Sequence, residues 1–382
     1  MSIDEVANTQ QATGSSFRGR RGLRFIIAGG GTGGHIFPAI AIANAIKQLQ
    51  PEATILFVGA KGKMEMEKVP QAGYEIQGLD IAGFNRSSLI KNIGLPVKLI
   101  KSFFQVSKIV KEFNPDAVIG VGGYSSFPVL KYAQKKNIPT FIHESNSFAG
   151  KANIMLGKKA SKIFVASDGM EKFFPADKIV ITGNPVRKNI ASSTVSRAEG
   201  IKFFGLEEDK KTILVVGGSL GARSINEVIT AHILDLGPLN LQLIWQTGKT
   251  NQQVYKERSR PLSNVWVNEF IVEMDKAYAA ADVVISRAGA MAVTELCVAG
   301  KPVIFVPYPH AAEDHQTVNA KHLVDKHAAI MIKDEEAKGK LFPQIITLAK
   351  DEKLQQNLKA NISRLAVRDA DDKIAKAILE AL

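Results

Sequence analysis

The chain has 382 residues, of which 45% are hydrophobic and 23% charged, and these values predict an ordinary globular protein of two domains. The formal net charge of +12 suits an acidic partner such as nucleic acid, anionic lipid or a diphosphate ligand. The sequence has no RNP-like aromatic motif, zinc-finger spacing or basic heptad helix, so we expect no nucleic-acid partner.

The single cysteine, Cys297, excludes a disulfide framework and a thiolate metal site. It lies in the apolar stretch 294–298, which favours a buried structural thiol. Residues 1–21 are polar, without an apolar signal-peptide core, and we expect a flexible extension there. No stretch is apolar for long enough to span a bilayer, so we expect the protein to stay in the cytoplasm.

The first half of the chain begins with a strand, a glycine loop and a helix. Residues 23–28 form an apolar strand pattern, residues 29–34 read GGGTGG, and a helix is predicted from about Pro38. Further apolar runs predict strands that alternate with helices, at residues 54–59, 116–121, 140–143, 162–166 and 178–182.

The second half repeats this beginning. Strand 212–216 leads into the glycine loop 217–222 and a helix from about Arg223. Further strands are predicted at residues 241–246, 264–268, 282–286, 302–306 and 328–332. The sequence therefore predicts an α/β protein with two doubly wound Rossmann-like domains facing a cleft. We expect an N-terminal domain at 22–185, a C-terminal domain at 186–365, and a last helix within 366–382 whose packing partner the pattern does not give.

The two glycine loops predict a phosphate-containing ligand, because glycine loops at strand ends bring backbone N–H groups close to anions. A dinucleotide cofactor is disfavoured, since strand 54–59 ends in Gly59-Ala60-Lys61 and offers no acid for a ribose. A P-loop is excluded, because Leu243 stands where the pattern before Gly248 requires glycine.

Six ordered blocks resemble the MurG family, glycosyltransferase family 28. They are GGGTGGHIFP at 29–38, HESN at 143–146, GNPVR at 183–187, GGSLGAR at 217–223, RAGAMAVTE at 287–295 and DHQTVNA at 314–320. The resemblance covers about residues 22–380. It implies a GT-B fold and inverting transfer of N-acetylglucosamine (GlcNAc) from UDP-GlcNAc. The implied acceptor hydroxyl is the 4-hydroxyl of N-acetylmuramic acid in the undecaprenyl-linked precursor lipid I, and the product is lipid II for peptidoglycan.

The resemblance also implies the residues that bind the donor. Ile271 would contact uracil, Glu295 the ribose hydroxyls, and Gln316 and Asn146 the sugar, while Ser219 and Arg187 would contact the diphosphate. An interdomain salt bridge is the alternative for Arg187, and an ordinary solvated position the alternative for Glu295. The whole expected donor set is Thr32, Gly33, Gly34, Asn146, Arg187, Ser219, Ile271, Ala290, Met291, Ala292, Val293, Thr294, Glu295 and Gln316.

Two residues are candidates for the base that takes the acceptor proton. His35 follows the first glycine loop at a helix N-terminus, and a histidine titrates near neutral pH. Glu144 is the other candidate, because a partly desolvated carboxylate can act as a base. We favour His35. Acidic residues do not converge in sequence near the glycine loops, so we expect no metal and no cofactor.

Residues 83–104 combine apolar side chains with lysine and arginine, which is typical of a helix lying on an anionic membrane surface. A core helix with a solvated basic face fits the pattern equally well. The lipid acceptor implied by the resemblance favours a peripheral protein on the cytoplasmic face of the bacterial inner membrane. The same acceptor is compatible with cell-wall or divisome proteins as partners.

Three other functions suit the same architecture. A UDP-GlcNAc 2-epimerase would need no lipid acceptor, and a glycolipid glycosyltransferase would differ in acceptor and donor sugar. A non-catalytic UDP-sugar-binding scaffold would bind the donor without turnover, and the presence of His35, Glu144 and Glu295 argues against it.

Overall fold

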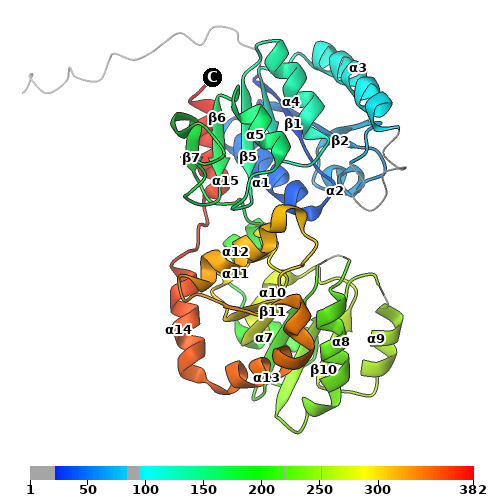
Figure 1. Cartoon of the computed structure of the whole chain (residues 1–382), viewed down its shortest axis with the longest axis vertical. Coiled ribbons are helices and arrows are strands. Elements are labelled where there is room, and N and C mark those ends of the chain that lie inside the picture. Colours follow the sequence, from blue (N-terminus) through cyan, green and yellow to red (C-terminus); the bar gives the residue numbers. More distant parts are fainter. Residues whose placement is uncertain (1–21, 84–93, 219, 251) are drawn as a thin grey trace, which may run out of the picture.

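The computed structural model describes residues 22–83, 94–218, 220–250 and 252–382. The predicted 1–21 extension, Ser219 and the 84–93 part of the predicted membrane-facing segment lie outside the described residues. Two α/β units lie one above the other (Figure 1).

The N-terminal unit is built on a seven-stranded parallel sheet with the order β3-β2-β1-β4-β5-β6-β7. Side chains that alternate along β1 face opposite sides of the sheet, so Phe25 and Ile27 pack with α1, while Ile26 and Ala28 pack with α3 and α4. The strands are β1 Arg24–Ala28, β2 Thr54–Ala60, β3 Glu75–Leu79, β4 Ala117–Gly120, β5 Thr140–Glu144, β6 Lys162–Val165 and β7 Ile179–Ile181. The helices are α1 Gly33–Leu49, α2 Glu65–Gln71, α3 Leu95–Phe113, α4 Ser126–Lys135 and α5 Lys151–Gly157.

The C-terminal unit is built on a six-stranded parallel sheet with the order β10-β9-β8-β11-β12-β13. Its strands are β8 Lys211–Val216, β9 Leu241–Gln246, β10 Val265–Asn268, β11 Val283–Ser286, β12 Val303–Phe305 and β13 Ile330–Met331. One face is covered by α7 Arg197–Phe204, α10 Met274–Ala280, α11 Ala290–Ala299 and α12 His315–Val324, and the other by α8 Arg223–His232, α9 Gln252–Ser259 and α13 Ala337–Lys350. The short helix α6 Lys188–Ala191 follows the N-terminal sheet, and α14 Glu352–Ser363 follows α13.

The last helix, α15 Ala370–Leu379, returns to the N-terminal unit and packs against α1 (Figure 1, red). Ile374, Ala375 and Ile378 are buried in the same apolar cluster as Ile42 and Ile46 of α1. This contact gives the predicted helix within 366–382 its packing partner.

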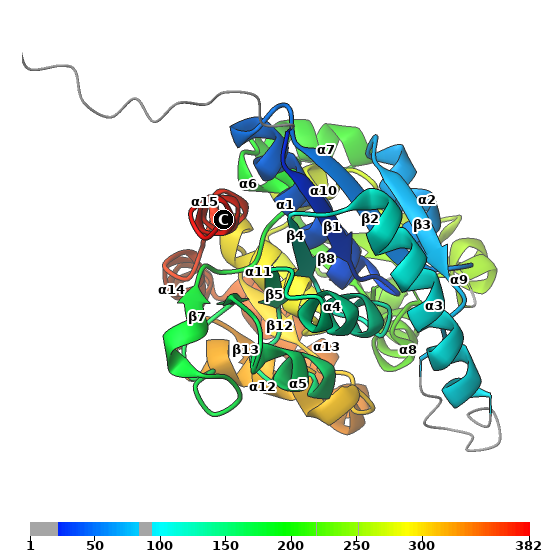
Figure 2. The same cartoon turned by 90° about the horizontal axis from the view of Figure 1, so that it is seen from above.

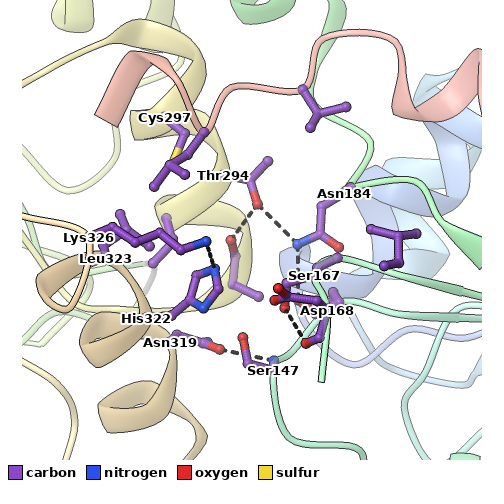
Figure 3. Close-up of a pocket in the computed structure, with 18 residues that line it drawn as sticks. Ser147, Ser167, Asp168, Asn184, Thr294, Cys297, Asn319, His322, Leu323 and Lys326 are labelled. Atoms are coloured by element: carbon purple, nitrogen blue, oxygen red, sulfur yellow. Dashed lines mark hydrogen bonds between the residues drawn. The ribbon is translucent and has the colours of Figure 1, made fainter. Parts of the chain in front are cut away.

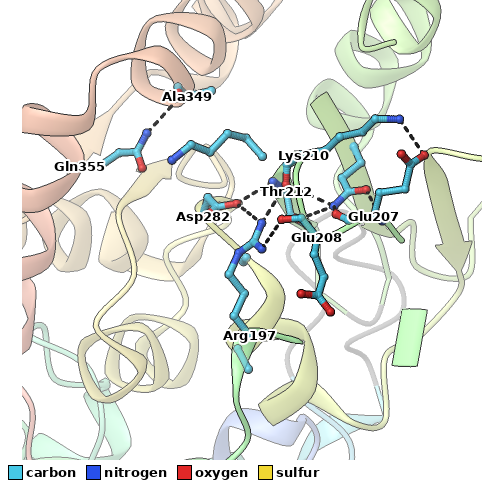
Figure 4. Close-up of polar contacts among 12 residues, drawn as sticks. Arg197, Glu207, Glu208, Lys210, Thr212, Asp282, Ala349 and Gln355 are labelled. Atoms are coloured by element: carbon cyan, nitrogen blue, oxygen red, sulfur yellow. Dashed lines mark hydrogen bonds and ion pairs between the residues drawn. The ribbon is translucent and has the colours of Figure 1, made fainter. Parts of the chain in front are cut away.

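A polar network lies at the amino ends of the central strands β8 and β11, at the opposite end of these strands from the glycine loop (Figure 4). Asp282 Oδ2 accepts hydrogen bonds from Thr212 N at 2.8 Å and Arg197 Nη2 at 3.2 Å. Arg197 also donates to the carbonyl oxygens of Glu208 and Lys210 at 2.7 and 2.8 Å. These hydrogen bonds hold the amino ends of β8 and β11 against α7. The candidate site lies at the other, carboxyl ends of the same strands.

Candidate active site

Both glycine loops lie where ligands bind in doubly wound sheets. The strand order reverses between β1 and β4 in one sheet and between β8 and β11 in the other. Loops that follow the carboxyl ends of strands at such a reversal form a crevice. The loop 29–34 follows β1, and the loop 217–222 follows β8.

His35 lies in the first turn of α1 beside the first glycine loop. Its Nδ1 is 3.1 Å from the carbonyl oxygen of Gly30, and since a carbonyl oxygen only accepts, Nδ1 carries the hydrogen. Nε2 of neutral His35 is therefore the proton acceptor. Burial lowers the pKa of His35, and the negative charge of Glu144 opposes that shift. The geometry thus presents a neutral imidazole with a basic Nε2.

The His35 ring packs against the backbone that follows β4. A Cβ atom at Gly122, whose φ is +93°, would lie 2.7 Å from His35 Cδ2 and 2.8 Å from Nε2. A side chain at this position would displace the imidazole, so the glycine makes room for it.

Glu144 ends β5 and holds the loop that follows. Its Oε1 accepts from the backbone N and side-chain Nδ2 of Asn146 at 3.0 and 3.2 Å. Its Oε2 accepts from Gly150 N at 3.1 Å and Asn153 Nδ2 at 2.8 Å. A carboxylate has about four lone-pair sites, and four donors already use them. The structure therefore gives Glu144 the geometry of a loop anchor.

The N-terminus of α11 has the geometry of an anion site. Gly289 precedes the helix in an extended conformation and supplies no side-chain cap. The first helical N–H groups, from Ala290, Met291 and Ala292, therefore have no capping side chain. Such N–H groups, together with the helix dipole, favour a bound phosphate.

Arg187 and Glu295 form a two-pronged ion pair. Arg187 Nε donates to Glu295 Oε1 at 2.9 Å, and Nη2 donates to Oε2 at 3.0 Å. The Tyr278 hydroxyl donates to Oε2 at 3.3 Å. Glu295 is 7% exposed, so it is not an ordinary solvated helix residue. The guanidinium also lies over the Phe37 ring, with Cζ 5.4 Å from the ring centroid.

Polar contacts join the two units across a pocket of about 340 Å³ (Figure 3). Asn184 Nδ2 donates to the carbonyl oxygen of Ser145 and to Thr294 Oγ1, both at 3.0 Å. Ser147 N donates to Asn319 Oδ1 at 3.2 Å. Three of the predicted donor residues line this pocket, namely Ala290, Val293 and Thr294, whereas His35 lies outside its lining.

The remaining predicted residues are spread around these groups. Ile271 is 1% exposed and its N–H donates to Gln246 Oε1 at 3.0 Å, so this N–H already has a protein partner. Gln316 lies in the first turn of α12, and its Oε1 accepts from Tyr308 N at 3.0 Å. Thr32 precedes α1, and Gly33 and Gly34 begin it.

The sequence analysis missed several residues that the fold brings to this site. Glu65 and Tyr124 lie at the first glycine loop, Tyr278 contacts Glu295, and Asn184 bridges the units. The glycine pair Gly122-Gly123 follows β4 just as the two glycine loops follow β1 and β8. This pair was the signal in the sequence that pointed to the neighbouring Tyr124. Within the described ranges, no group of three or more His, Cys, Asp or Glu side chains is placed to hold a metal ion.

Comparison with known proteins identifies the same two units. The glycosyltransferase family 28 N-terminal domain matches residues 25–165, and the family 28 C-terminal domain matches residues 212–374. A relative from Bacteroides fragilis is 52% identical over 363 residues, which cover 94% of this chain and 95% of the relative. That relative is a UDP-N-acetylglucosamine--N-acetylmuramyl-(pentapeptide) pyrophosphoryl-undecaprenol N-acetylglucosamine transferase.

Solved structures agree on the fold. The crystal structure of MurG from Acinetobacter baumannii has a TM-score of 0.75 and 30% identity, and the match covers 94% of this chain and 99% of that one. A UDP-N-acetylglucosamine 2-epimerase has a TM-score of 0.65 at 14% identity, over 94% of this chain and 96% of that one, and so shares the fold alone. The predicted fold, two Rossmann-like units in the GT-B arrangement, is confirmed.

Proposed function

This chain belongs to glycosyltransferase family 28, and from that membership we propose that it transfers GlcNAc from UDP-GlcNAc to the 4-hydroxyl of N-acetylmuramic acid in lipid I, giving lipid II for peptidoglycan synthesis. One observation carries this function: identity of 52% with a transferase of this name extends over 94% of the chain. A likeness of fold alone would leave the epimerase as an equal candidate.

In the proposed reaction, the acceptor 4-hydroxyl attacks the anomeric carbon of GlcNAc from the face opposite UDP. The new O–C bond forms as the bond from C1 to the diphosphate oxygen breaks, and the configuration inverts. His35 Nε2 takes the hydroxyl proton, a role supported by the Nδ1–H bond to Gly30, which leaves Nε2 as the basic atom. Glu144 accepts from four N–H donors, three in the loop 145–150 and one in α5, and this occupation argues against it as the base.

We place the donor diphosphate at the N-terminus of α11, where the N–H groups of Ala290, Met291 and Ala292 stabilise the leaving charge. Glu295 accepts from the ribose hydroxyls. Because Arg187 occupies both carboxylate oxygens in this structure, donor binding exchanges the guanidinium for the ribose diol and frees Arg187 for the diphosphate. Gln316 and Asn146 contact the sugar, and Ser219 and Ile271 complete the donor set.

The lipid acceptor requires a membrane surface, and α3 has the side chains for one. Val97, Ile100 and Phe104 are 69%, 59% and 74% exposed, although the opposite face of the helix is buried. Lysines surround the adjoining groove of α3 and α4, namely Lys111, Lys131, Lys135, Lys136 and Lys159. We propose that this surface, here called the α3 patch, holds the enzyme on the cytoplasmic leaflet through apolar contact and attraction to anionic lipid. Across the described ranges, no helix is both long and apolar enough to cross a bilayer. Cell-wall or divisome partners stay a prediction.

The test of function is UDP release from UDP-GlcNAc by the purified full chain, with and without a lipid I analogue. We expect release to depend on the analogue and to match the amount of disaccharide lipid formed. Release without acceptor, accompanied by free N-acetylmannosamine, would identify an epimerase instead. Binding of UDP-GlcNAc without turnover under both conditions would identify a scaffold.

A further inference from the structure

Glu65 is a buried carboxylate that has no role in the reaction proposed above. It begins α2, it is 1% exposed, and both of its oxygens accept backbone N–H groups. Oε2 accepts from Gly31 N at 2.8 Å, and Oε1 accepts from Ala60 N at 3.0 Å. The carboxylate therefore joins the first glycine loop to the end of β2.

Two glycines make room for this side chain. A Cβ atom at Gly30 would lie 2.3 Å from Glu65 Oε1, and one at Gly59 would lie 2.5 Å from Glu65 Cγ. Real Cβ atoms do not approach other atoms this closely, so any larger residue at either position would displace Glu65. The loop after β1 and the end of β2 are thus built around the carboxylate.

The peptide group between Gly30 and Gly31 connects Glu65 to His35. Its N–H donates to Glu65 Oε2, and its carbonyl oxygen accepts from His35 Nδ1–H at 3.1 Å. Hydrogen bonds in such a chain polarise one another, so a negative charge on the N–H side makes the carbonyl oxygen a stronger acceptor. The arrangement resembles a carboxylate that orients a histidine, with one peptide group placed between them.

We propose that Glu65 is a positioning residue for His35, which acts through the peptide group between Gly30 and Gly31 to fix the Nδ1–H tautomer and to stabilise the imidazolium formed when Nε2 takes the acceptor proton. This proposal rests on the proposed function and adds a group to its proton transfer. No proton crosses the peptide group; the proton stays on His35 until it passes to solvent.

The charged and titratable groups that face His35 come from three elements. Glu144 and His143 lie on β5, Glu65 on α2, and His315 on α12. Burial lowers the pKa of His35 most, while the charges of Glu144 and Glu65 raise it and His315 lowers it. Glu65→Gln removes one of the two negative charges and lowers the pKa of His35 further. Since His35 must be neutral to act as a base, the acid limb of the pH–rate profile then moves to lower pH.

The experiment measures kcat, KM for UDP-GlcNAc and the acid limb of kcat for wild type, Glu65→Gln and Glu67→Gln. Glu67 lies on the same helix, is exposed and pairs with Lys68, so Glu67→Gln is the matched control. For Glu65→Gln we expect kcat to fall about tenfold or more, which is part of the roughly 100- to 10,000-fold that a positioned base contributes. The acid limb should move to lower pH, with KM for UDP-GlcNAc near the wild-type value. We expect Glu67→Gln to match wild type.

Two further variants separate this role from a structural one. Glu65→Asp keeps the charge but shortens the side chain, so it should lower kcat while the acid limb stays at the wild-type pH. Should Glu65→Gln fail to fold, an unchanged kcat or a moved acid limb in Glu65→Asp overturns the proposal by itself. In a His35→Gln background, Glu65→Gln should change kcat by less than about twofold, because coupled residues are not additive. An acid limb that does not move in Glu65→Gln, or one that moves equally in Glu65→Asp, overturns the proposal, as does a full additive loss in the double variant. Wild-type protein that does not use the lipid I analogue would overturn the proposed function itself.

Discussion

At the residue scale, two buried carboxylates organise the loops around His35. Glu65 takes N–H groups from the first glycine loop and the end of β2, and Glu144 takes three from the loop after β5 and one from Asn153 in α5. Buried acids with all oxygens hydrogen-bonded fix the backbone around them, because removal of one partner leaves an unpaired charge. His35, whose Nε2 is left as acceptor, is the group that such a frame holds for proton transfer.

His143 gives the protein a pH-dependent stability. It is 1% exposed, and burial, aided by the nearby His35, lowers its pKa to about 4. The unfolded chain binds this proton at the ordinary pKa of about 6.5, so it carries more protons than the folded chain between these values. Stability is therefore lost as pH falls from about 6.5 towards 4, by about 3 kcal/mol from this side chain.

Urea unfolding of wild type and His143→Gln at pH 7 and pH 4.5 measures this contribution. We expect the wild type to lose more free energy of unfolding than the variant over this range, since the variant has no imidazole to protonate. An equal loss in both proteins would mean that His143 is protonated in the folded state.

Motifs in the sequence indicated residues for the site, but not the residues that contact them in the fold. His35 and Glu295 stand in recognisable motifs, but Glu65 stands in none, because its partners at Gly31 and Ala60 come from separate loops. The ion pair of Arg187 with Glu295 joins residues 108 positions apart, and it uses two residues that were predicted as separate ligand contacts. Contacts over such distances depend on the fold and leave no local pattern in the sequence.

At the element scale, the first half of α3 exposes several large apolar side chains. Its buried residues Val106, Ile109 and Val110 lie towards its carboxyl end, whereas Val97, Ile100 and Phe104 are exposed. The helix runs along the outer margin of the N-terminal unit (Figure 2). A solvated helix face would carry polar residues at these positions. The α3 patch therefore has the composition of a membrane contact.

Phe104→Asp should weaken binding to vesicles that contain anionic phosphatidylglycerol. Transfer of a Phe side chain out of water contributes about 2 kcal/mol, so we expect the partition coefficient to fall about tenfold or more. The control is Leu234→Asp, since Leu234 is 70% exposed and lies in the C-terminal unit. Vesicle sedimentation at low and at high salt separates the apolar contribution to binding from the electrostatic one. Equal binding of the two variants would exclude the α3 patch as the membrane contact.

Strands that read as apolar runs were predicted, and β3, which does not read as one, was missed. β1, β4 and β5 read as continuous apolar runs because helices cover both sides of the sheet. β3, with the sequence EIQGL, was missed, since polar residues and a glycine interrupt its apolar side chains and of its five residues Leu79 alone is fully buried. Edge position alone does not hide a strand, since β7, β10 and β13 also lie at sheet edges and were predicted from their apolar runs.

At the scale of the whole molecule, the chain passes between the two units twice, once between β7 and α6 and again between α14 and α15. The contacts Asn184–Thr294 and Ser147–Asn319 lie beside the first passage. The domain limits of 22–185 and 186–365 stay a prediction, although both sheets lie inside them. The sequence predicted the last helix but not its place, because its apolar face would suit either unit.

Ile374→Ala should destabilise the N-terminal unit although the residue lies near the end of the chain. Ile374 is fully buried against α1, and such a truncation costs about 2–5 kcal/mol. Calorimetry with saturating UDP, which we expect to stabilise the C-terminal unit, should show the UDP-insensitive transition at a lower temperature. Ile362→Ala, in the core of the C-terminal unit, should lower the other transition. If both variants lowered the temperature of the same single transition, the two units would unfold together.

The packing of α15 on α1 also determines when the protein can finish folding during translation. The N-terminal sheet is complete once β7 leaves the ribosome, but the apolar side of α1 that α15 covers stays open until the last helix emerges. The entire C-terminal sheet is synthesised in that interval, which lasts on the order of tens of seconds at about 5–20 residues per second. During this time the nascent chain exposes a hydrophobic face that a chaperone can bind, and the emergence of α15 is the step that closes the first domain.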